Sequence, residues 1–317
     1  MRTITALFVG LGSIGTRHLK NLANLCADRG WTLQADALRS DLTRPLRPGA
    51  AELLHAQYTD PATAPAHYDM VFITNPTSLH AEALRQVKGR GEALFIEKPI
   101  FSAEQTGLTL DELLPAGQKA YVAAPMRWCG AMLALKDRLP ALHPYCARVI
   151  CSSYLPDWRP GVDYRTVYSA RKALGGGVTI DLIHEWDYLV ELFGVPEKLY
   201  NFKGTYSELE IDSDDLSVYI AKYPTLLAEV HLDYFGRGYR RSIELFCRDG
   251  SYLADFGKGA LTLPDGTVQH YEEDVNRRYE REMEYFVDYA LTGCGESCNP
   301  PALALKVLKL TLGENVQ

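Results

Sequence analysis

The stretch "VGLGSIG", residues 9–15, decides the fold of the first part of the chain. It follows the apolar residues "TALF" and precedes four apolar residues at the spacing of a buried helix face, namely Leu19, Leu22, Ala23 and Cys26. Gly10 makes a tight turn, Gly12 lets the backbone approach a pyrophosphate, and Gly15 allows close packing of the helix. With Ser13 and Ile14, these glycines predict a dinucleotide site, because free N–H groups at a helix N-terminus attract phosphate.

Further strand and helix patterns continue this unit. Four short apolar runs read as parallel strands covered on both faces: "WTLQADAL" (31–38), "DMVFIT" (69–74), "ALFIEK" (93–98) and "KAYVAA" (119–124). A helix over residues 78–87 lies between two of them. The fold class is therefore α/β, with a doubly wound parallel Rossmann sheet over residues 1–125.

After about residue 145 the pattern changes to longer alternating strands. Examples are "LSVYIA" (216–221), "LLAEVHLDY" (226–234), "SIELFC" (242–247) and "SYLADF" (251–256). Helices are expected over residues 181–193, over residues 280–291 and after Pro301. Residues 126–317 are thus predicted to form an α+β domain with an open, mostly antiparallel sheet, and the last helix is free to pack back on the first domain.

Composition limits the class of protein. The 317 residues are 47% apolar, which is enough for two cores, and the net charge of −7 argues against nucleic-acid and anionic-membrane partners. No apolar run reaches the length of a membrane-spanning helix. The seven cysteines lack paired metal-ligand spacing, so we expect reduced thiols in a cytoplasmic protein, no metal site and a small soluble ligand.

The end of the second strand bears on the choice of cofactor. An acid there accepts from the ribose hydroxyls of NAD, whereas a cation takes the 2′-phosphate of NADP. The strand ends in Arg39 and Ser40, which favours NADP(H). Asp41 follows directly and leaves NAD open.

Four motifs together resemble the glucose-fructose oxidoreductase / inositol dehydrogenase / MocA family: "GLGSIGTRHLKNL" (10–22), "FITNPTSLH" (72–80), "IEKPI" (96–100) and "GGGVTIDLIHEWDYL" (175–189). The resemblance covers essentially the whole chain. It implies redox chemistry with NAD or NADP on a sugar, cyclitol or related polyol, and a second domain that binds substrate. It also implies a homodimer or homotetramer formed through the open sheet of that domain.

The resemblance also assigns roles to the first domain. It places a segment beside the cofactor, comprising Thr74, Asn75, Pro76 and His80, and it gives Lys98 the nicotinamide side, next to Glu97. Physical reasoning agrees, because Glu97 and Lys98 close a strand at its carboxyl end, where open α/β sheets bind ligands. Pro99 is a cis or a turn proline.

In "APMRW" (124–128), Arg127 matches a family arginine and is a candidate substrate ligand. Pro125 stands where asparagine is frequent in the family. The proline removes an amide group and a backbone donor, so contacts carried over from that position are in doubt.

The predicted helix over residues 181–193 carries the catalytic candidates. On a helical wheel Asp181, His184, Glu185 and Tyr188 share one polar face, as on any amphipathic surface helix. The preceding glycines and the family's acid and histidine favour catalysis. His184 would act as base near neutral pH, Lys98 would hydrogen-bond the reacting oxygen, and Asp181 would bind substrate hydroxyls or orient the histidine. Histidine follows aspartate after three residues rather than the four common in the family, so Glu185 is a further substrate candidate.

A turn-rich loop precedes this helix and contributes four more candidate substrate ligands: Trp158, Tyr164, Arg165 and Tyr168. Aromatic faces suit a sugar ring, and arginines suit a carboxylate or phosphate. A packed interface loop is an alternative.

Three functions remain open. The leading one is hydride transfer between a nicotinamide cofactor and a secondary alcohol of a sugar, sugar acid, cyclitol or nucleotide sugar. The others are an NAD-dependent glycosidase and a cofactor-sensing protein without turnover. The sequence leaves open the specific substrate, the direction of reaction and the oligomer size.

Overall fold

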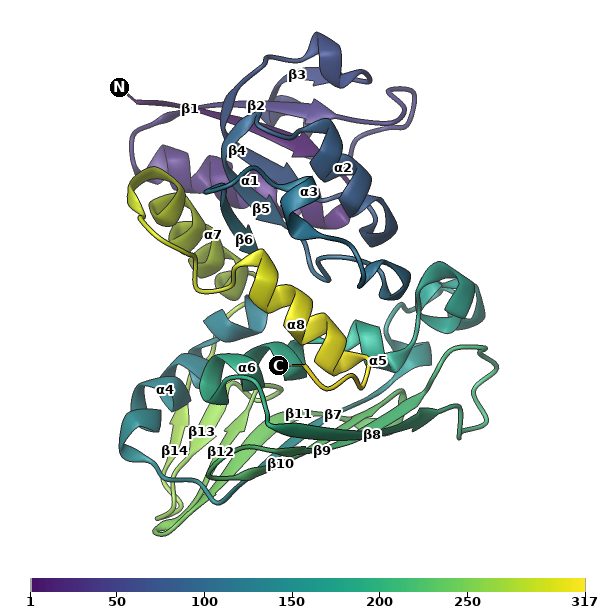
Figure 1. The fold of residues 1–317 in the computed structure, drawn as a ribbon, viewed down its shortest axis with the longest axis vertical. Helices are drawn as coiled ribbons and strands as arrows, with labels where there is room; N and C mark the ends of the chain where they lie inside the picture. The colour runs from purple at the N-terminus through teal and green to yellow at the C-terminus, as the bar shows by residue number, and fades with distance from the viewer. Residues whose placement is uncertain (1, 317) are drawn as a thin grey trace. The chain divides into compact units, whose positions relative to one another are not determined.

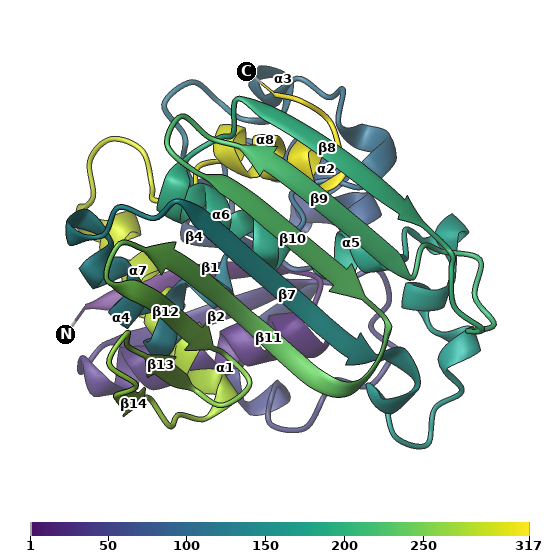
Figure 2. The same ribbon diagram turned by 90° about the horizontal axis from the view of Figure 1, so that it is seen from below.

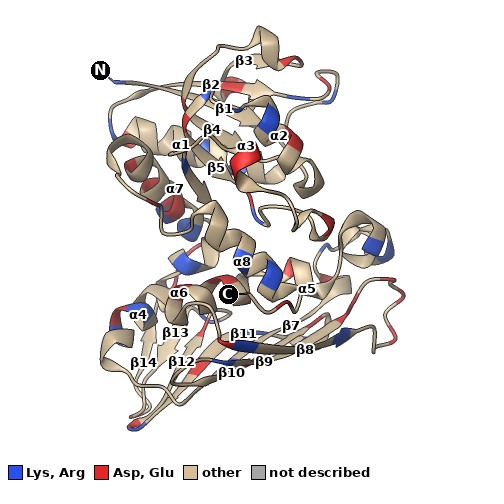
Figure 3. Cartoon of the chain, viewed as in Figure 1, with Lys and Arg blue, Asp and Glu red and all other residues tan. Residues whose placement is uncertain are grey.

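The computed structural model describes residues 2–316 and divides the chain into two compact units. The first comprises Met1–Ala123 and Tyr279–Leu305, and the second comprises Ala124–Arg278 and Lys306–Gln317. The chain therefore returns to its first unit after completing most of its second. Acidic and basic residues are interspersed in both units (Figure 3).

The first unit is built on a six-stranded parallel sheet in the order β3-β2-β1-β4-β5-β6 (Figure 1). Its strands are β1 (Thr3–Val9), β2 (Thr32–Leu38), β3 (Leu54–Tyr58), β4 (Tyr68–Ile73), β5 (Gly91–Ile96) and β6 (Lys119–Val122). Its helices are α1 (Ser13–Asp28), α2 (His80–Gln86) and α3 (Leu110–Leu113), together with most of α7 (Val275–Thr292) and the start of α8 (Pro301–Thr311). The strand order is that of a Rossmann fold, so the predicted fold class is confirmed.

Aromatic packing joins the returning helix to this sheet. The rings of Phe8 and Phe72 stack with centroids 4.5 Å apart. Phe286 of α7 meets Phe72 and Phe95 edge-on at 5.4 and 5.1 Å. All four side chains are fully buried, so α7 completes the core of the first unit.

The second unit contains an eight-stranded sheet in the order β14-β13-β12-β11-β7-β10-β9-β8. Its strands are β7 (Cys146–Tyr154), β8 (Lys198–Gly204), β9 (Leu216–Lys222), β10 (Leu227–Asp233), β11 (Phe235–Cys247), β12 (Gly250–Asp255), β13 (Ala260–Thr262) and β14 (Val268–His270). All neighbours are antiparallel except β7 and β10. The helices α4 (Gly130–Arg138), α5 (Val178–Asp181) and α6 (His184–Phe193) lie on one face, and Figure 2 looks onto the other face.

The expected single helix over residues 181–193 is wrong at its start. Asp181 ends α5, Leu182 and Ile183 form a turn, and His184 begins α6. A continuous wheel across this turn is therefore not valid. Glu185 and Tyr188 point into the core and are fully buried, whereas His184 is partly exposed.

Candidate functional site

The glycine motif forms a cradle at the N-terminus of α1. Gly10 has φ +82°, and a Cβ there would lie 2.7 Å from the Cα of Asn75, so only glycine fits. Gly12 has open space around its Cβ position and caps α1 without a side-chain hydrogen bond. Gly15 packs against Thr74, whose hydroxyl donates to the carbonyl of Gly10 at 2.6 Å. The free N–H groups and the open side of Gly12 fit a pyrophosphate.

A hollow lies at the end of β2. It has a volume of about 430 Å³, and its lining includes Arg39, Arg44 and Arg47. Arg39 donates to the side chain of Gln57 at 2.7 Å and to the carbonyl of Arg44, which fixes its guanidinium. Ser40 is exposed next to it.

The acid beside Ser40 is held by its own turn. The Oδ1 atom of Asp41 accepts from the backbone and the hydroxyl of Thr43 at 2.8 and 2.6 Å. These bonds, with the nearby arginine charges, lower the pKa of Asp41. The lowered pKa keeps Asp41 anionic, and its Oδ2 atom lies 3.5 Å from Nε of Arg44. Glu52 also lines the hollow, so its three arginines are partly balanced by acidic side chains.

In the segment after β4, Asn75 and His80 have different hydrogen-bond surroundings. The Oδ1 atom of Asn75, beside Gly10, is buried and accepts no hydrogen bond from residues 2–316. Pro76 is exposed. His80 is fully buried, and its ring nitrogens lie 3.1 and 3.0 Å from the carbonyl oxygens of Ile100 and Asn75. The expected direct cofactor contact of His80 is therefore not met; its ring ties the Asn75 turn to the segment after β5.

Glu97 and Lys98 close β5 as expected, but Glu97 has an internal partner. His18 of α1 donates to its Oε1 atom at 2.5 Å, and the backbone of Lys98 donates to its Oε2 atom at 3.0 Å. Burial alone would raise the pKa of Glu97, but His18 and the charge of Lys98 together hold it below its ordinary value. Glu97 thus fixes the backbone of Lys98, whose following peptide bond to Pro99 is cis.

The ammonium of Lys98 differs from the carboxylate of Glu97 in its hydrogen bonding. Lys98 is partly exposed, and its Nζ atom makes no hydrogen bond or ion pair with the described part of the chain. A lysine at a strand end with a fixed backbone and an uncommitted ammonium suits the binding of a ligand oxygen.

In the second unit, Asp181 is the centre of a polar cluster. Tyr168 donates its hydroxyl to Oδ1 of Asp181, and Tyr234 donates to Oδ2, both at 2.6 Å. Asp181 is 8% exposed. His184 follows one turn later and begins α6.

The glycines before α5 bring the Tyr168 segment to Asp181. A Cβ on Gly176 would overlap the carbonyl oxygen of Tyr168. Gly177 has φ +135°, and a Cβ there would overlap the carboxylate of Asp214. Asp214 in turn accepts from the backbone and hydroxyl of Thr179 at the start of α5. The two glycines before Asp181 therefore allow two close contacts that a side chain would block. Gly176 approaches the carbonyl of Tyr168, and Gly177 approaches the carboxylate of Asp214.

Glu185 does not share the position of His184. It is fully buried, and both of its oxygens accept from Arg241 of β11, at 2.7 and 3.0 Å. Burial acts against the charge of Arg241, but Glu185 raises its pKa well above the ordinary value. With no exposed surface and both oxygens paired, Glu185 is a structural residue, which corrects the expected substrate contact.

Arg127 is likewise paired inside the second unit. Its guanidinium is 3% exposed, makes two hydrogen bonds to Asp187 at 3.0 and 2.8 Å, and contacts Glu191, which also pairs with Lys136. Arg127 therefore ties the turn at Pro125 to α6, and the structure offers no exposed guanidinium for the expected substrate contact.

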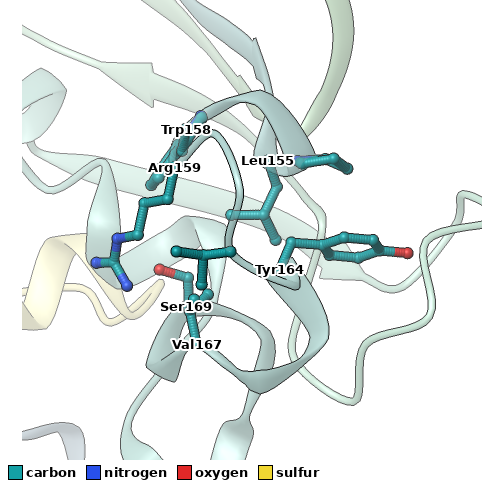
Figure 4. A pocket seen from close by; sticks show the side chains of 8 residues that line it. Leu155, Trp158, Arg159, Tyr164, Val167 and Ser169 are labelled. Atoms are coloured by element: carbon teal, nitrogen blue, oxygen red, sulfur yellow. The ribbon is translucent and has the colours of Figure 1, made fainter.

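The loop over residues 155–171 surrounds a small pocket (Figure 4). Trp158 packs edge-on against Tyr234 with centroids 5.2 Å apart and donates to Ser153 at 3.0 Å. Tyr164 and Arg159 lie on opposite sides of the pocket, with their polar ends directed away from each other. Arg165 pairs with Asp163 and Glu210 at the surface, at 2.9 and 2.8 Å, so its charge is already neutralised.

Sequence reasoning missed His18, Tyr234 and Arg241. His18 stood inside the quoted motif, and its place on the buried face of α1 was readable from the helical spacing. Tyr234, in the link between β10 and β11, and Arg241 of β11 lie 53 and 56 residues away from their partners, a separation that no local pattern reveals. Within residues 2–316 no cluster of three or more possible ligand side chains could hold a metal ion, and no helix there is long and apolar enough to span a membrane.

Comparisons with known proteins agree with this geometry. Residues 4–122 match the sequence model of the oxidoreductase family with an NAD-binding Rossmann fold. No curated protein matches the chain.

Solved structures resemble the whole chain. A UDP-N-acetylglucosamine 3-dehydrogenase from Acidithiobacillus ferrooxidans is 18% identical, with 99% of this chain and 97% of that chain covered and a TM-score of 0.72. A myo-inositol 2-dehydrogenase from Lactobacillus plantarum is 20% identical, with coverage of 98% and 96% and a TM-score of 0.75. A levoglucosan dehydrogenase in complex with NADH and levoglucosan is 15% identical, with coverage of 98% and 96% and a TM-score of 0.81. At these identities the likeness shows the fold.

The glycine cradle and the match over residues 4–122 lead to one assignment. Residues 4–122 form a Rossmann domain that matches the model of the NAD-binding oxidoreductase family of glucose-fructose oxidoreductase, inositol dehydrogenase and MocA.

Proposed function

We propose that this protein transfers hydride between a nicotinamide cofactor, preferably NADP(H), and a secondary alcohol of a sugar-like substrate. The observation that carries the proposal is the open glycine cradle at Gly12 in a domain that matches this oxidoreductase family. The similar structures act on UDP-N-acetylglucosamine, myo-inositol and levoglucosan by their names, and each of these compounds carries secondary alcohols.

The chemical roles follow from the groups themselves. When bound, the nicotinamide supplies the acceptor or donor of hydride. His184 would take the proton of the substrate hydroxyl, because imidazole titrates near neutral pH. The ammonium of Lys98 would hydrogen-bond the reacting oxygen and stabilise its negative charge. Asp181 would accept hydrogen bonds from substrate hydroxyls.

A turnover screen tests this function. Purified protein is mixed with NADP⁺ or NAD⁺ and a panel of polyols, sugar acids and nucleotide sugars, and reduced nicotinamide is followed by absorbance. Appearance of reduced cofactor with one class of sugar supports the proposal. Release of free sugar from glycosides without net cofactor reduction would instead indicate a glycosidase, and binding of cofactor without any turnover would indicate a sensor.

Two variants test the assigned residues. We expect His184→Asn and Lys98→Met to lose turnover by about 100-fold or more, since general acid–base catalysis contributes factors of this size. The dissociation constant of the cofactor should stay within a few-fold of wild type. Unchanged turnover in either variant would remove that residue from the mechanism.

The cofactor preference rests on the arginines around the hollow at β2. Arg44 and Arg47 are exposed, and charge-assisted hydrogen bonds from arginine suit a phosphate. We expect NADPH to bind more tightly than NADH, and Arg44→Gln with Arg47→Gln to remove most of that difference. Tighter binding of NADH by the wild-type protein would refute the preference.

The helix-free face of the second sheet supports a homodimer or homotetramer. Tyr200 and Phe202 on β8 are 53% and 73% exposed, and Ile220, opposite Tyr200 on β9, is 41% exposed. Light scattering should give a multiple of the chain mass, and Phe202→Lys should shift the measured mass towards that of the monomer.

The seven cysteines are free thiols, which supports a cytoplasmic location.

A further inference from the structure

The carboxylate of Asp181 is held from both sides by phenol groups. Tyr168 reaches it from the loop before α5, and Tyr234 reaches it from the link between β10 and β11. The sequence offers no local reason for this arrangement, because the donors lie 13 and 53 residues from the aspartate. Two donors at 2.6 Å from one nearly buried carboxylate constitute a specific arrangement rather than a chance surface contact.

Tyr234 is fixed by its surroundings. It is fully buried, its carbonyl accepts from the backbone of Leu155 at 2.9 Å, and its own backbone donates to Asp215. Trp158 covers its ring edge-on. The first residues of the loop over 155–171 are therefore attached to this tyrosine.

Tyr168 is fixed differently. Tyr168 as a whole residue is 44% exposed, yet its hydroxyl points inward to Asp181. Its neighbour Ser169 is buried, and the carbonyl of Ser169 accepts from the hydroxyl of Ser213 at 2.7 Å. Gly176 leaves just enough room for the carbonyl of Tyr168. The position of this hydroxyl thus depends on the conformation of the loop and of the glycine run.

We propose that Tyr168 and Tyr234 are positioning residues for the reaction, which hold the Asp181 carboxylate correctly oriented towards substrate hydroxyls. The inference rests on the proposed function for the role of Asp181. It makes the loop over residues 155–171 a part of the site through Tyr168, and it replaces the simpler expectation that Tyr168 contacts the substrate itself.

The acceptor capacity of a carboxylate allows this role. Its two oxygens offer about four lone-pair positions, of which the tyrosines occupy two, so positions remain for substrate hydroxyls. Burial, with the nearby Asp181 charge, raises the pKa of both Tyr168 and Tyr234 above the ordinary value. Both phenols therefore stay protonated at working pH and remain donors.

Phenylalanine variants test the inference because they remove only the hydroxyl. With the substrate identified by the screen, we expect Tyr168→Phe and Tyr234→Phe each to lower kcat/KM by about tenfold to 100-fold, the usual range for a hydrogen bond to a charged group. Loss of a donor to the charged form raises the pKa of a carboxylate. The acid limb of kcat/KM should therefore move to higher pH. Cofactor affinity should not change.

Tyr223→Phe is the matched control. Tyr223 is a buried tyrosine of the same unit whose hydroxyl has no partner within residues 2–316, so its removal should leave kcat/KM and the pH profile unchanged. Wild-type kcat/KM and an unmoved acid limb in both Tyr168→Phe and Tyr234→Phe would overturn the inference while leaving the proposed function intact. An equal loss in the control would also overturn it.

A measurement that needs no turnover separates the two proposals. The carboxyl carbon of Asp181 is followed by NMR in protein labelled at aspartate, with Asp181→Asn to assign its signal. A higher titration midpoint in the tyrosine variants than in wild type supports the hydrogen-bonded carboxylate. If the wild-type protein turned over no substrate, the proposed function would fail and the positioning role with it, whereas an unchanged midpoint would overturn the inference alone.

Discussion

Replacing Arg241 by methionine should destabilise the second unit by about 3–5 kcal/mol, because it leaves the buried carboxylate of Glu185 without its partner. The two side chains are 13% and 0% exposed, and they share hydrogen bonds of 2.7 and 3.0 Å. At an effective dielectric constant of about 20, unit charges about 4 Å apart attract by about 4 kcal/mol. This attraction is of the same size as the free energy of unfolding that is lost when one partner of a buried ion pair is removed.

The double variant Glu185→Met with Arg241→Met separates structure from function. Replacing both partners by apolar side chains of similar volume removes the unpaired charge, so the free energy of unfolding should return to within about 2 kcal/mol of wild type. Urea denaturation followed by circular dichroism measures it. Lys258→Met is the surface control: its ion pair with Asp255 lies at 3.6 Å with the lysine 81% exposed, so a change below about 1 kcal/mol is expected.

Turnover by the same double variant decides the role of Glu185. If Glu185 is structural, the refolded double variant should keep kcat within about tenfold of wild type. A stable double variant without turnover would refute the reasoning, since it would mean that the Glu185 carboxylate acts on the substrate. A stable Arg241→Met single variant would refute the energetic argument.

Three further results are expected. Gly10→Ala should weaken NADPH binding by about tenfold or more in a fluorescence titration, because the alanine meets the Cα of Asn75 at 2.7 Å and adopts an unfavourable positive φ; wild-type affinity would contradict this. Gly176→Ala should lower kcat/KM as the phenol variants do and also lower the unfolding midpoint, since its Cβ overlaps a backbone carbonyl; a neutral effect on both would show that the loop can move aside. The folded pKa of Glu97 is lowered by His18, so its contribution to stability is present above the ordinary value of about 4.3 and is lost as pH falls through the lower folded value. Glu97→Gln should therefore flatten the acid side of the stability curve, and an identical curve would contradict the pair.

Much of the fold was predictable because its patterns are local. The glycine motif and the apolar runs of the first 125 residues identified the parallel sheet, and only the short, half-exposed β3 was missed there. In the second unit, four alternating segments identified β9 to β12. β7 was missed, although it lies in the middle of the sheet between β10 and β11, which follow it by about 80 to 100 residues.

The site was predictable only as far as single residues. Asp181 and Lys98 were found from motifs, but their partners were not, since pairs such as Glu97 with His18 are set by tertiary packing. The turn at Leu182 and Ile183 was missed because apolar residues there continue a helical pattern. That break explains why Glu185 turns inward to Arg241. Choosing candidate site residues by helical periodicity therefore brought together the partly exposed His184 and the buried, ion-paired Glu185.

The return of the chain to its first unit has a consequence for biosynthesis. The last strand of that unit, β6, is joined to residues near the other end of the chain: the backbone of Val122 donates to Asn299 at 2.9 Å, and Ser297 donates to Ala120 at 2.7 Å. Phe286 fills the core beneath the sheet. A ribosome that has made only the first 125 residues therefore releases a sheet with an uncovered apolar face. We therefore expect the nascent chain to keep this face exposed until residues 279–305 have been synthesised, because the first unit is encoded by two separate stretches of the chain.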